Sequence, residues 1–271
     1  TINSTDPAAS AEFYAKRFDC RKERFAGRED AIWTQKSWLF FNKVKHAPPS
    51  EIASAIWHIG WGAENMRAEY ERQIALGTKF ETPITDISKL ANFQGFYYAY
   101  VQGPDRELIE LNTAGHHRFG HLHLLSEDPV AAAEWYADKL GAPKPRRAPS
   151  REPRYYEGFQ VGPSASFNVD NVNFIIFPAG YIQKQWPELW ESRKGFASPR
   201  GRVIDHIGLS VEKLDAALKE LANKGVKIVS KPAKFRQTKQ RAAMIEGPDK
   251  ILIQLVEGHA SEPGAAETKT K

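Results

Sequence analysis

Three histidines occupy matching positions near the start of short apolar segments. They are His58 in "IWHIGW", His121 in "FGHLHL" and His206 in "IDHIGL". Side chains on a strand alternate between its two faces, so each histidine is expected to point away from the flanking apolar side chains. Imidazoles can bind a divalent metal ion or transfer protons, although a single buried histidine is more often structural.

Two other polar residues match each other near the ends of later segments. Glu110 and Gln254 each lie six residues after the proline of a "GPD" turn. An inward carboxylate or amide oxygen beside an inward imidazole is a ligand set that divalent metals accept. His123 shares a face with His121 and is therefore a candidate general base, with a hydrogen-bonding role as the alternative.

These positions belong to an internal repeat. Residues 4–20, "STDPAASAEFYAKRFDC", match residues 126–142, "SEDPVAAAEWYADKLGA", at an offset of 122. Residues 57–80 also match residues 205–228, and the "GPD" segment that begins at residue 103 matches the one that begins at residue 247. The chain is therefore expected to consist of four modules in the order A, B, A, B.

Each module has the pattern of one strand, one helix and three further strands. In the last module Leu214, Leu218 and Leu221 have helical spacing, and Gly225 suits the left-handed residue that ends a helix. Gly77 is expected to end the helix of the second module. Segments such as "FYYAYV" and "NFIIF" are typical of strands. The sequence thus predicts an α+β protein of four βαβββ modules.

A single module of this kind cannot bury both its helix and its strand face, so the modules are expected to pair. We predict one domain over residues 1–115, from modules 1 and 2, and a second over 116–257, from modules 3 and 4. Residues 258–271 lack apolar periodicity and are expected to form a loose, flexible tail.

The second domain carries an insertion over residues 180–201. The interval between the second and third matching histidines is 22 residues longer than the interval between the first and second. Trp186 and Trp190 in this insertion are candidate substrate-binding residues that would cover the site. The alternative is that both tryptophans seal the seam between the domains.

Composition narrows the class of partner. The 271 residues carry a net charge of +5 and one cysteine, without zinc-finger spacing or an apolar run long enough to cross a membrane. We expect a small-molecule partner and neither nucleic acid nor membrane, in a monomer or homodimer. The sequence starts at Thr1, so a cytoplasmic protein and a periplasmic or secreted one with a removed signal are both open.

The paired modules, with "HIG" opening one and "GPD…IEL" closing it, resemble the vicinal oxygen chelate superfamily, which includes glyoxalases, extradiol dioxygenases and bleomycin-resistance proteins. The resemblance extends to about Glu257. It implies two glyoxalase-like domains with cupped mixed sheets. It also implies that each cup holds one divalent metal, with ligands from the opening and closing strands of the modules.

On this resemblance, the C-terminal cup would bind metal through His121, His206 and Gln254. Gln254 departs from the two histidines and one carboxylate of extradiol dioxygenases, although some glyoxalases use a glutamine ligand. The N-terminal cup would offer His58 and Glu110 as a second, weaker site, because its third ligand would lie just before the first residue. A buried hydrogen-bonded pair is the alternative for those two residues.

The function expected from the resemblance is a metal-dependent lyase, isomerase or dioxygenase. It would act on a small oxygenated substrate in the C-terminal cup, with Fe, Mn, Zn or Ni as the metal. The alternative is a non-catalytic protein that sequesters a small molecule, as bleomycin-resistance proteins do.

Overall fold

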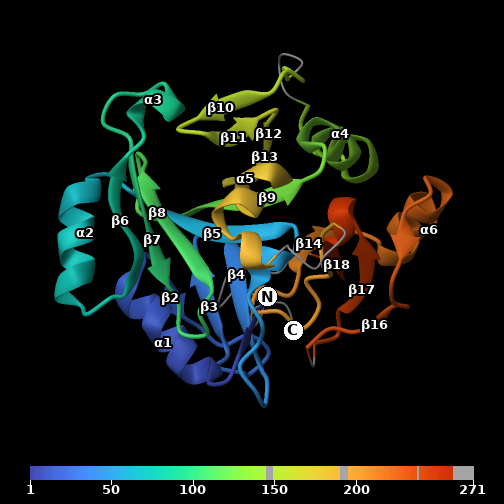
Figure 1. Cartoon of the computed structure of the whole chain (residues 1–271). Helices are drawn as coiled ribbons and strands as arrows, with labels where there is room; N and C mark the ends of the chain where they lie inside the picture. Colours follow the sequence, from blue (N-terminus) through green and yellow to red (C-terminus); the bar gives the residue numbers. More distant parts are fainter. Residues whose placement is uncertain (145–148, 190–194, 237, 259–271) are drawn as a thin grey trace.

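The computed structural model describes residues 1–144, 149–189, 195–236 and 238–258 (Figure 1). Module 1 contains β1 (Ile2–Ser4), α1 (Pro7–Arg17), β2 (Arg21–Lys22), β3 (Ala31–Thr34) and β4 (Ser37–Lys43). Module 2 contains η1 (Glu51–Ala53), β5 (Ile56–Ala63), α2 (Met66–Ala75), β6 (Phe80–Asp86), α3 (Ser88–Ala91), β7 (Tyr97–Gln102) and β8 (Leu108–Thr113).

Modules 3 and 4 repeat this order with additions. Module 3 contains β9 (Phe119–Ser126), α4 (Pro129–Leu140), β10 (Arg154–Tyr156), β11 (Phe159–Gly162), β12 (Ala165–Val169), β13 (Val172–Pro178), α5 (Ala179–Gln185) and η2 (Pro187–Leu189). Module 4 contains β14 (Ile207–Val211), α6 (Leu214–Asn223), β15 (Lys227–Ile228), β16 (Ala233–Lys234), β17 (Arg241–Glu246), η3 (Pro248–Lys250) and β18 (Leu252–Glu257). The predicted α+β fold of four βαβββ modules is confirmed.

The repeated "S-x-D-P" sequence marks the point where the first helix of modules 1 and 3 begins. Asp6 accepts a hydrogen bond from the Ala9 N–H at 3.2 Å, and Asp128 accepts one from the Ala131 N–H at 3.0 Å. In each helix a proline follows the cap, where its missing N–H costs nothing. The predicted glycines follow the helices of modules 2 and 4, with positive φ of 69° at Gly77 and 76° at Gly225.

The strands pair the modules differently from the expectation. Modules 2 and 3 share one seven-stranded sheet, in the order β12-β13-β9-β5-β8-β7-β6, and β5 runs antiparallel to β9 at its centre (Figure 1). Module 1 forms a four-stranded sheet, and it meets module 4 through an antiparallel bridge between Ile2 and Ile204. The predicted pairing of 1 with 2 and 3 with 4 is therefore wrong at the level of the strands.

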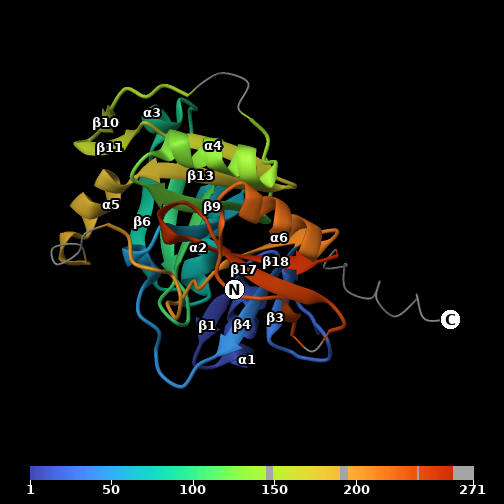
Figure 2. The ribbon, with the colours of Figure 1, turned by 90° about the vertical axis from the view of Figure 1, so that its right-hand side faces the viewer.

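Helices α1 and α4 each cover one face of the sheets. Tyr14 and Phe18 of α1 lie 5.6 and 4.8 Å from the Trp61 ring of β5, so modules 1 and 2 share an apolar core. Helix α4 runs along β13, where the Tyr136 ring lies 5.0 Å from that of Phe167 (Figure 2). The division into domains 1–115 and 116–257 stays a prediction. The predicted tail lies outside the described residues from 259 onwards. Among the described helices, none combines the length and apolar character needed to cross a bilayer.

Candidate metal centre

Four buried side chains converge in the shared sheet of modules 2 and 3. His58, Glu110, His121 and His123 each offer a ligand atom, and these four atoms lie within 4.8 Å of one another. The His58 Nε2 atom lies 3.0 Å from Glu110 Oε2 and 3.2 Å from His123 Nδ1. The His121 Nε2 atom lies 3.6 Å from Glu110 Oε1. We refer to these four residues as the metal centre.

The strand register explains the convergence. On the antiparallel pair of β5 and β9, His58 lies opposite His123 and Gly60 opposite His121. Strand β8 runs parallel to β5 and places Glu110 beside Gly60. The matching position on β13, beside His123, is Ile175. Module 2 thus supplies a carboxylate to the centre and module 3 supplies none. The fourth ligand group is the imidazole of His123.

Gly60 makes room for the ring of His121. A Cβ atom added at Gly60 would lie 1.9 Å from His121 Cε1 and 2.2 Å from His121 Nε2, closer than any real contact. The imidazole therefore occupies the space that a side chain at position 60 would need. The matching Gly208 of module 4 has no described atom within 4 Å of such a Cβ.

Two irregularities in the strands change the expected faces. The register shifts between Ile56 and His58, so Trp57 lies in a bulge. Its ring is 4.7 Å from that of His123 and 4.8 Å from that of Tyr181, so Trp57 lies beside the metal centre and not on the helix side.

A second shift, at Gly120, moves Phe119 in the other direction. Strict alternation would place Phe119 on the same face as His121, but it pairs with Trp61 and lies 5.1 Å from that ring on the helix side. Both expectations assumed a perfect two-residue alternation. The bulges interrupt it.

The centre combines one charged ligand with neutral ones. Burial favours the uncharged form of Glu110, but the imidazoles of His121 and His58 outweigh it and lower the pKa of Glu110 to about 2. Burial lowers the pKa of His121 to about 4 and the pKa of His123 well below its usual range, against the opposing effect of Glu110. At neutral pH Glu110 is therefore a carboxylate and His121 and His123 are neutral imidazoles, which is the form that binds a cation.

Two polar neighbours hold the carboxylate. The Asn112 Nδ2 atom donates to Glu110 Oε1 at 2.8 Å, and the Tyr100 hydroxyl also hydrogen-bonds Glu110. Such bonds fix the direction in which a ligand presents its oxygen. Neither Tyr100 nor Asn112 was expected from the sequence. Strand alternation alone places Asn112, two residues after Glu110, on the same face of β8. Tyr100 lies opposite Glu110 on β7, which only the strand pairing reveals.

The residues present fit a divalent ion. Ligand atoms bound at about 2.1 Å lie about 3.0 Å apart at right angles and about 3.4 Å apart at a tetrahedral angle. The separations of 3.0, 3.2 and 3.6 Å are of this size. The buried Nε2 atom of His121 also has no hydrogen-bond partner among the described residues. Such orphaned acceptors are unusual in a core unless a ligand binds them.

The structure does not bring the predicted trio together. His121 belongs to the metal centre, whereas His206 and Gln254 line a separate cavity beside module 1. The physical reason is the strand pairing, since β9 pairs with β5 and β13 while β14 pairs with β18. The grouping of His121, His206 and Gln254 around one ion is therefore wrong. The pair expected to be weaker, His58 and Glu110, lies in the four-residue centre.

Of the two predicted substrate residues, the structure describes Trp186. Trp186 directly follows α5 and packs, half-buried, against the core. Trp190 lies outside the described residues. Another aromatic residue of the insertion, Tyr181, reaches the centre and stacks beside Trp57 and Phe177. The aromatic wall beside the metal centre consists of Trp57, Tyr98, Tyr100, Phe177 and Tyr181.

Known proteins share this fold. The chain superimposes on glyoxalase I from Zea mays with a TM-score of 0.69 at 12% identity, covering 94% of this chain and 90% of that one. It also superimposes on a Bacillus subtilis subsp. subtilis str. 168 protein described as a "putative dioxygenase", with a TM-score of 0.60 at 12% identity, covering 98% and 86%. No curated protein sequence matches the chain.

These likenesses show the fold, and a sequence profile adds the family. The profile of the Glyoxalase/Bleomycin resistance protein/Dioxygenase superfamily matches residues 118–255. This range covers modules 3 and 4, which repeat the plan of modules 1 and 2. The chain belongs to the Glyoxalase/Bleomycin resistance protein/Dioxygenase superfamily.

Proposed function

We propose that the chain is a divalent-metal-dependent enzyme of the vicinal oxygen chelate type. In this proposal His58, Glu110, His121 and His123 hold the ion, and the substrate is a small molecule with two adjacent oxygens. The observation that carries the proposal is the convergence of four ligand groups at one buried point, where the His121 Nε2 atom has no hydrogen-bond partner among the described residues. A bound divalent ion would supply Lewis-acid chemistry and stabilise negative charge on those oxygens.

The ligand set favours an anionic substrate oxygen. One carboxylate, Glu110, offsets only one of the two positive charges of a divalent ion. Because Ile175 occupies the position that matches Glu110, no second carboxylate from β13 completes the neutralisation. A substrate that binds as an enolate, a catecholate or a similar anion would supply the missing charge.

The residues around the metal centre would orient its carboxylate ligand and contact the substrate. Asn112 and Tyr100 hold Glu110 in place through their hydrogen bonds. Trp57, Phe177 and Tyr181 form an apolar wall that excludes water and favours a substrate with an apolar or aromatic part. In this proposal His123 acts as a ligand and not as the general base, because burial keeps its pKa well below neutrality.

Metal content and binding of a bidentate probe test the proposal. Mass spectrometry of the purified protein loaded with Zn²⁺, Mn²⁺, Fe²⁺ or Ni²⁺ is expected to find one ion per chain, and Glu110→Gln is expected to lose it. Acetohydroxamate, which binds through two adjacent oxygens, is expected to bind only the loaded protein. Equal, near-zero metal in both proteins would contradict the proposal, and ligand binding that a chelator leaves unchanged would favour sequestration.

A further inference from the structure

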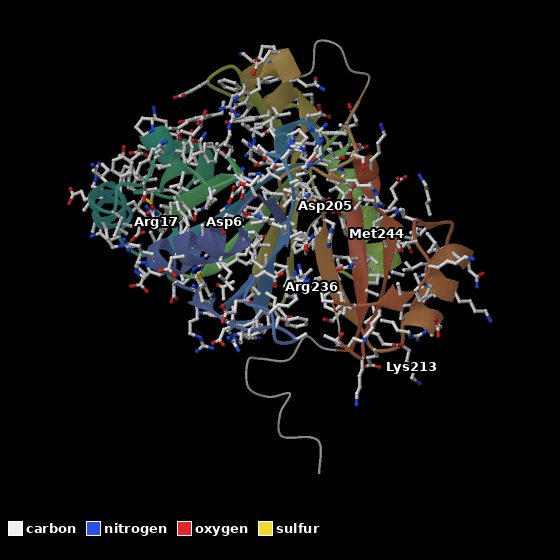
Figure 3. All side chains as sticks on the ribbon, turned by 90° about the horizontal axis from the view of Figure 1, so that it is seen from below. Asp6, Arg17, Asp205, Lys213, Arg236 and Met244 are labelled. Carbon is white, nitrogen blue, oxygen red and sulfur yellow. The ribbon has the colours of Figure 1, made fainter. Side chains whose placement is uncertain are left out.

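A second cavity lies where module 4 meets module 1. It has a volume of about 220 Å³, and its lining includes Asn42, His206, Lys234, Arg236 and Gln254. We refer to this space as the 1/4 cavity. Figure 3 labels Arg236, one of the lining residues, where the orange and red strands of module 4 adjoin the blue strands of module 1.

The 1/4 cavity occupies the place in module 4 that the metal centre occupies in module 2. Gln254 lies beside Gly208 just as Glu110 lies beside Gly60. The strand neighbour of Gln254 is Met244, where Glu110 has Tyr100.

The next cross-strand pair along β17 and β18 also has a smaller side chain than its counterpart in module 2. Ala242 of β17 pairs with Val256, where Tyr98 of β7 pairs with Asn112. Two tyrosine rings are thus replaced by methionine and alanine, and this replacement leaves room for a ligand.

The ligand atoms at this position are engaged elsewhere. The His206 Nδ1 atom lies 2.6 Å from Asp205 Oδ1, and the same imidazole hydrogen-bonds the Gln254 side chain. Gln254 also carries no charge with which to offset a cation. The groups that match two of the metal ligands therefore contact each other, and His206 is also paired with Asp205.

Positively charged side chains line the 1/4 cavity, where the metal centre has a carboxylate. Arg236 lies largely buried against the Phe40 ring, at 4.1 Å from its centre, and donates to Asn42 Oδ1 at 2.7 Å. Its carboxylate partner, Asp30, lies 3.4 Å away and is shared with Arg28, so two guanidinium groups face one acid.

The second cationic side chain of the cavity is that of Lys234. Lys234 makes no ion pair with any described residue. Three cations, Arg28, Arg236 and Lys234, thus outnumber the two carboxylates Asp30 and Asp205, and the net positive charge repels a metal ion and attracts an anion.

We propose that the 1/4 cavity binds a small organic anion without metal. Arg236 and Lys234 would hold its carboxylate or phosphate group, and Ser230 and Gln254 would hydrogen-bond its other polar atoms. The volume corresponds to about seven water molecules at ~30 Å³ each, which admits a molecule of the size of benzoate. The site is distinct from the metal centre, so its occupancy does not require the proposed enzyme activity.

Calorimetric titration with benzoate, neutral benzamide and inorganic phosphate tests the proposal. We expect benzoate or phosphate to bind once per chain in the Glu110→Gln variant as in the unaltered protein, and benzamide to bind at least ~10-fold more weakly. Arg236→Gln is expected to reduce anion affinity about 10-fold or more, as for a charge-assisted hydrogen bond. Lys234 is exposed, so Lys234→Gln should not affect folding, and we expect it to reduce anion affinity several-fold. This variant tests the proposal if Arg236→Gln does not fold.

Three results would overturn this inference. The first is no binding of either anion to the unaltered protein. The second is equal affinity for benzoate and benzamide, or unchanged anion affinity in both cavity variants. The third is retention by Glu110→Gln of a metal ion that is lost in the double variant with His206→Ala. Benzoate and phosphate distinguish a preference for carboxylates from one for phosphates.

Discussion

Gly60 offers a way to damage the metal centre without changing any ligand. In Gly60→Ala the new Cβ would lie 1.9 Å from His121 Cε1, whereas unbonded carbon atoms pack best at about 3.5 Å or more. The ring must therefore move by about 1.5 Å. Metal–ligand bonds tolerate deviations of only about 0.2 Å, so His121 would be lost as a ligand.

The size of the effect follows from the loss of one ligand among four. Changes to residues that merely support a ligand reduce metal affinity about 10–100-fold. Displacement of the ligand itself should exceed this, so we expect metal affinity to fall at least ~100-fold in Gly60→Ala. Gly208→Ala is the matched control, because its Cβ would meet no described atom within 4 Å.

Two measurements on Gly60→Ala and Gly208→Ala distinguish a loss of metal binding from a loss of folding. Competition against a chromophoric chelator gives the metal affinity, and thermal unfolding with and without metal gives the stabilisation that binding produces. At 100 times the dissociation constant of the unaltered protein, metal should stabilise that protein and Gly208→Ala by about 2.7 kcal/mol but Gly60→Ala much less. Equal metal affinity in the two alanine variants would refute the reasoning.

The remaining predictions concern charge in the core and the fourth ligand. Burial raises the pKa of Glu51 to about 8, although it accepts a hydrogen bond from the Leu108 N–H at 2.7 Å. The stability that this carboxyl contributes is full below pH 4.5 and is lost as pH rises to about 8. Glu51→Gln should therefore raise the free energy of unfolding by on the order of 3 kcal/mol at pH 7, or Tm by about 5 °C, and change it very little at pH 4.5. A difference in thermal unfolding that does not depend on pH would contradict this. His123→Ala should weaken metal binding at least ~10-fold, and adding Ile175→Glu should restore part of it, as titration calorimetry would show; affinity unchanged by His123→Ala would exclude it as a ligand. Asn112→Ala should weaken metal binding about 10-fold while leaving one ion per chain at saturation; unchanged affinity would show that Glu110 is held without it.

The repeat and the ends of the helices could be predicted because their causes are local. A capping aspartate and a proline define where α1 and α4 begin, and glycines at 77 and 225 follow the ends of their helices. The inward direction of His58, Glu110 and His121 follows from strand alternation in the same way.

The partners of these residues could not be predicted, because the repeat makes the choice symmetric. His58 and His206 occupy equivalent positions, so His121 could meet either of them, and the repeated sequence does not distinguish the two pairings. Nor does a bulge have a clear sequence mark, and the bulge at Trp57 turned an expected core residue into part of the site. Long-range pairing and local irregularity decide the centre, and neither is local in the sequence.

The most direct test of the central claim is anomalous diffraction from crystals of the zinc-loaded protein, measured at the zinc absorption edge. We predict one peak per chain, within bonding distance of His58, Glu110, His121 and His123, and none between His206 and Gln254. A peak at His206 and Gln254, or none at the four-residue centre, would contradict the account.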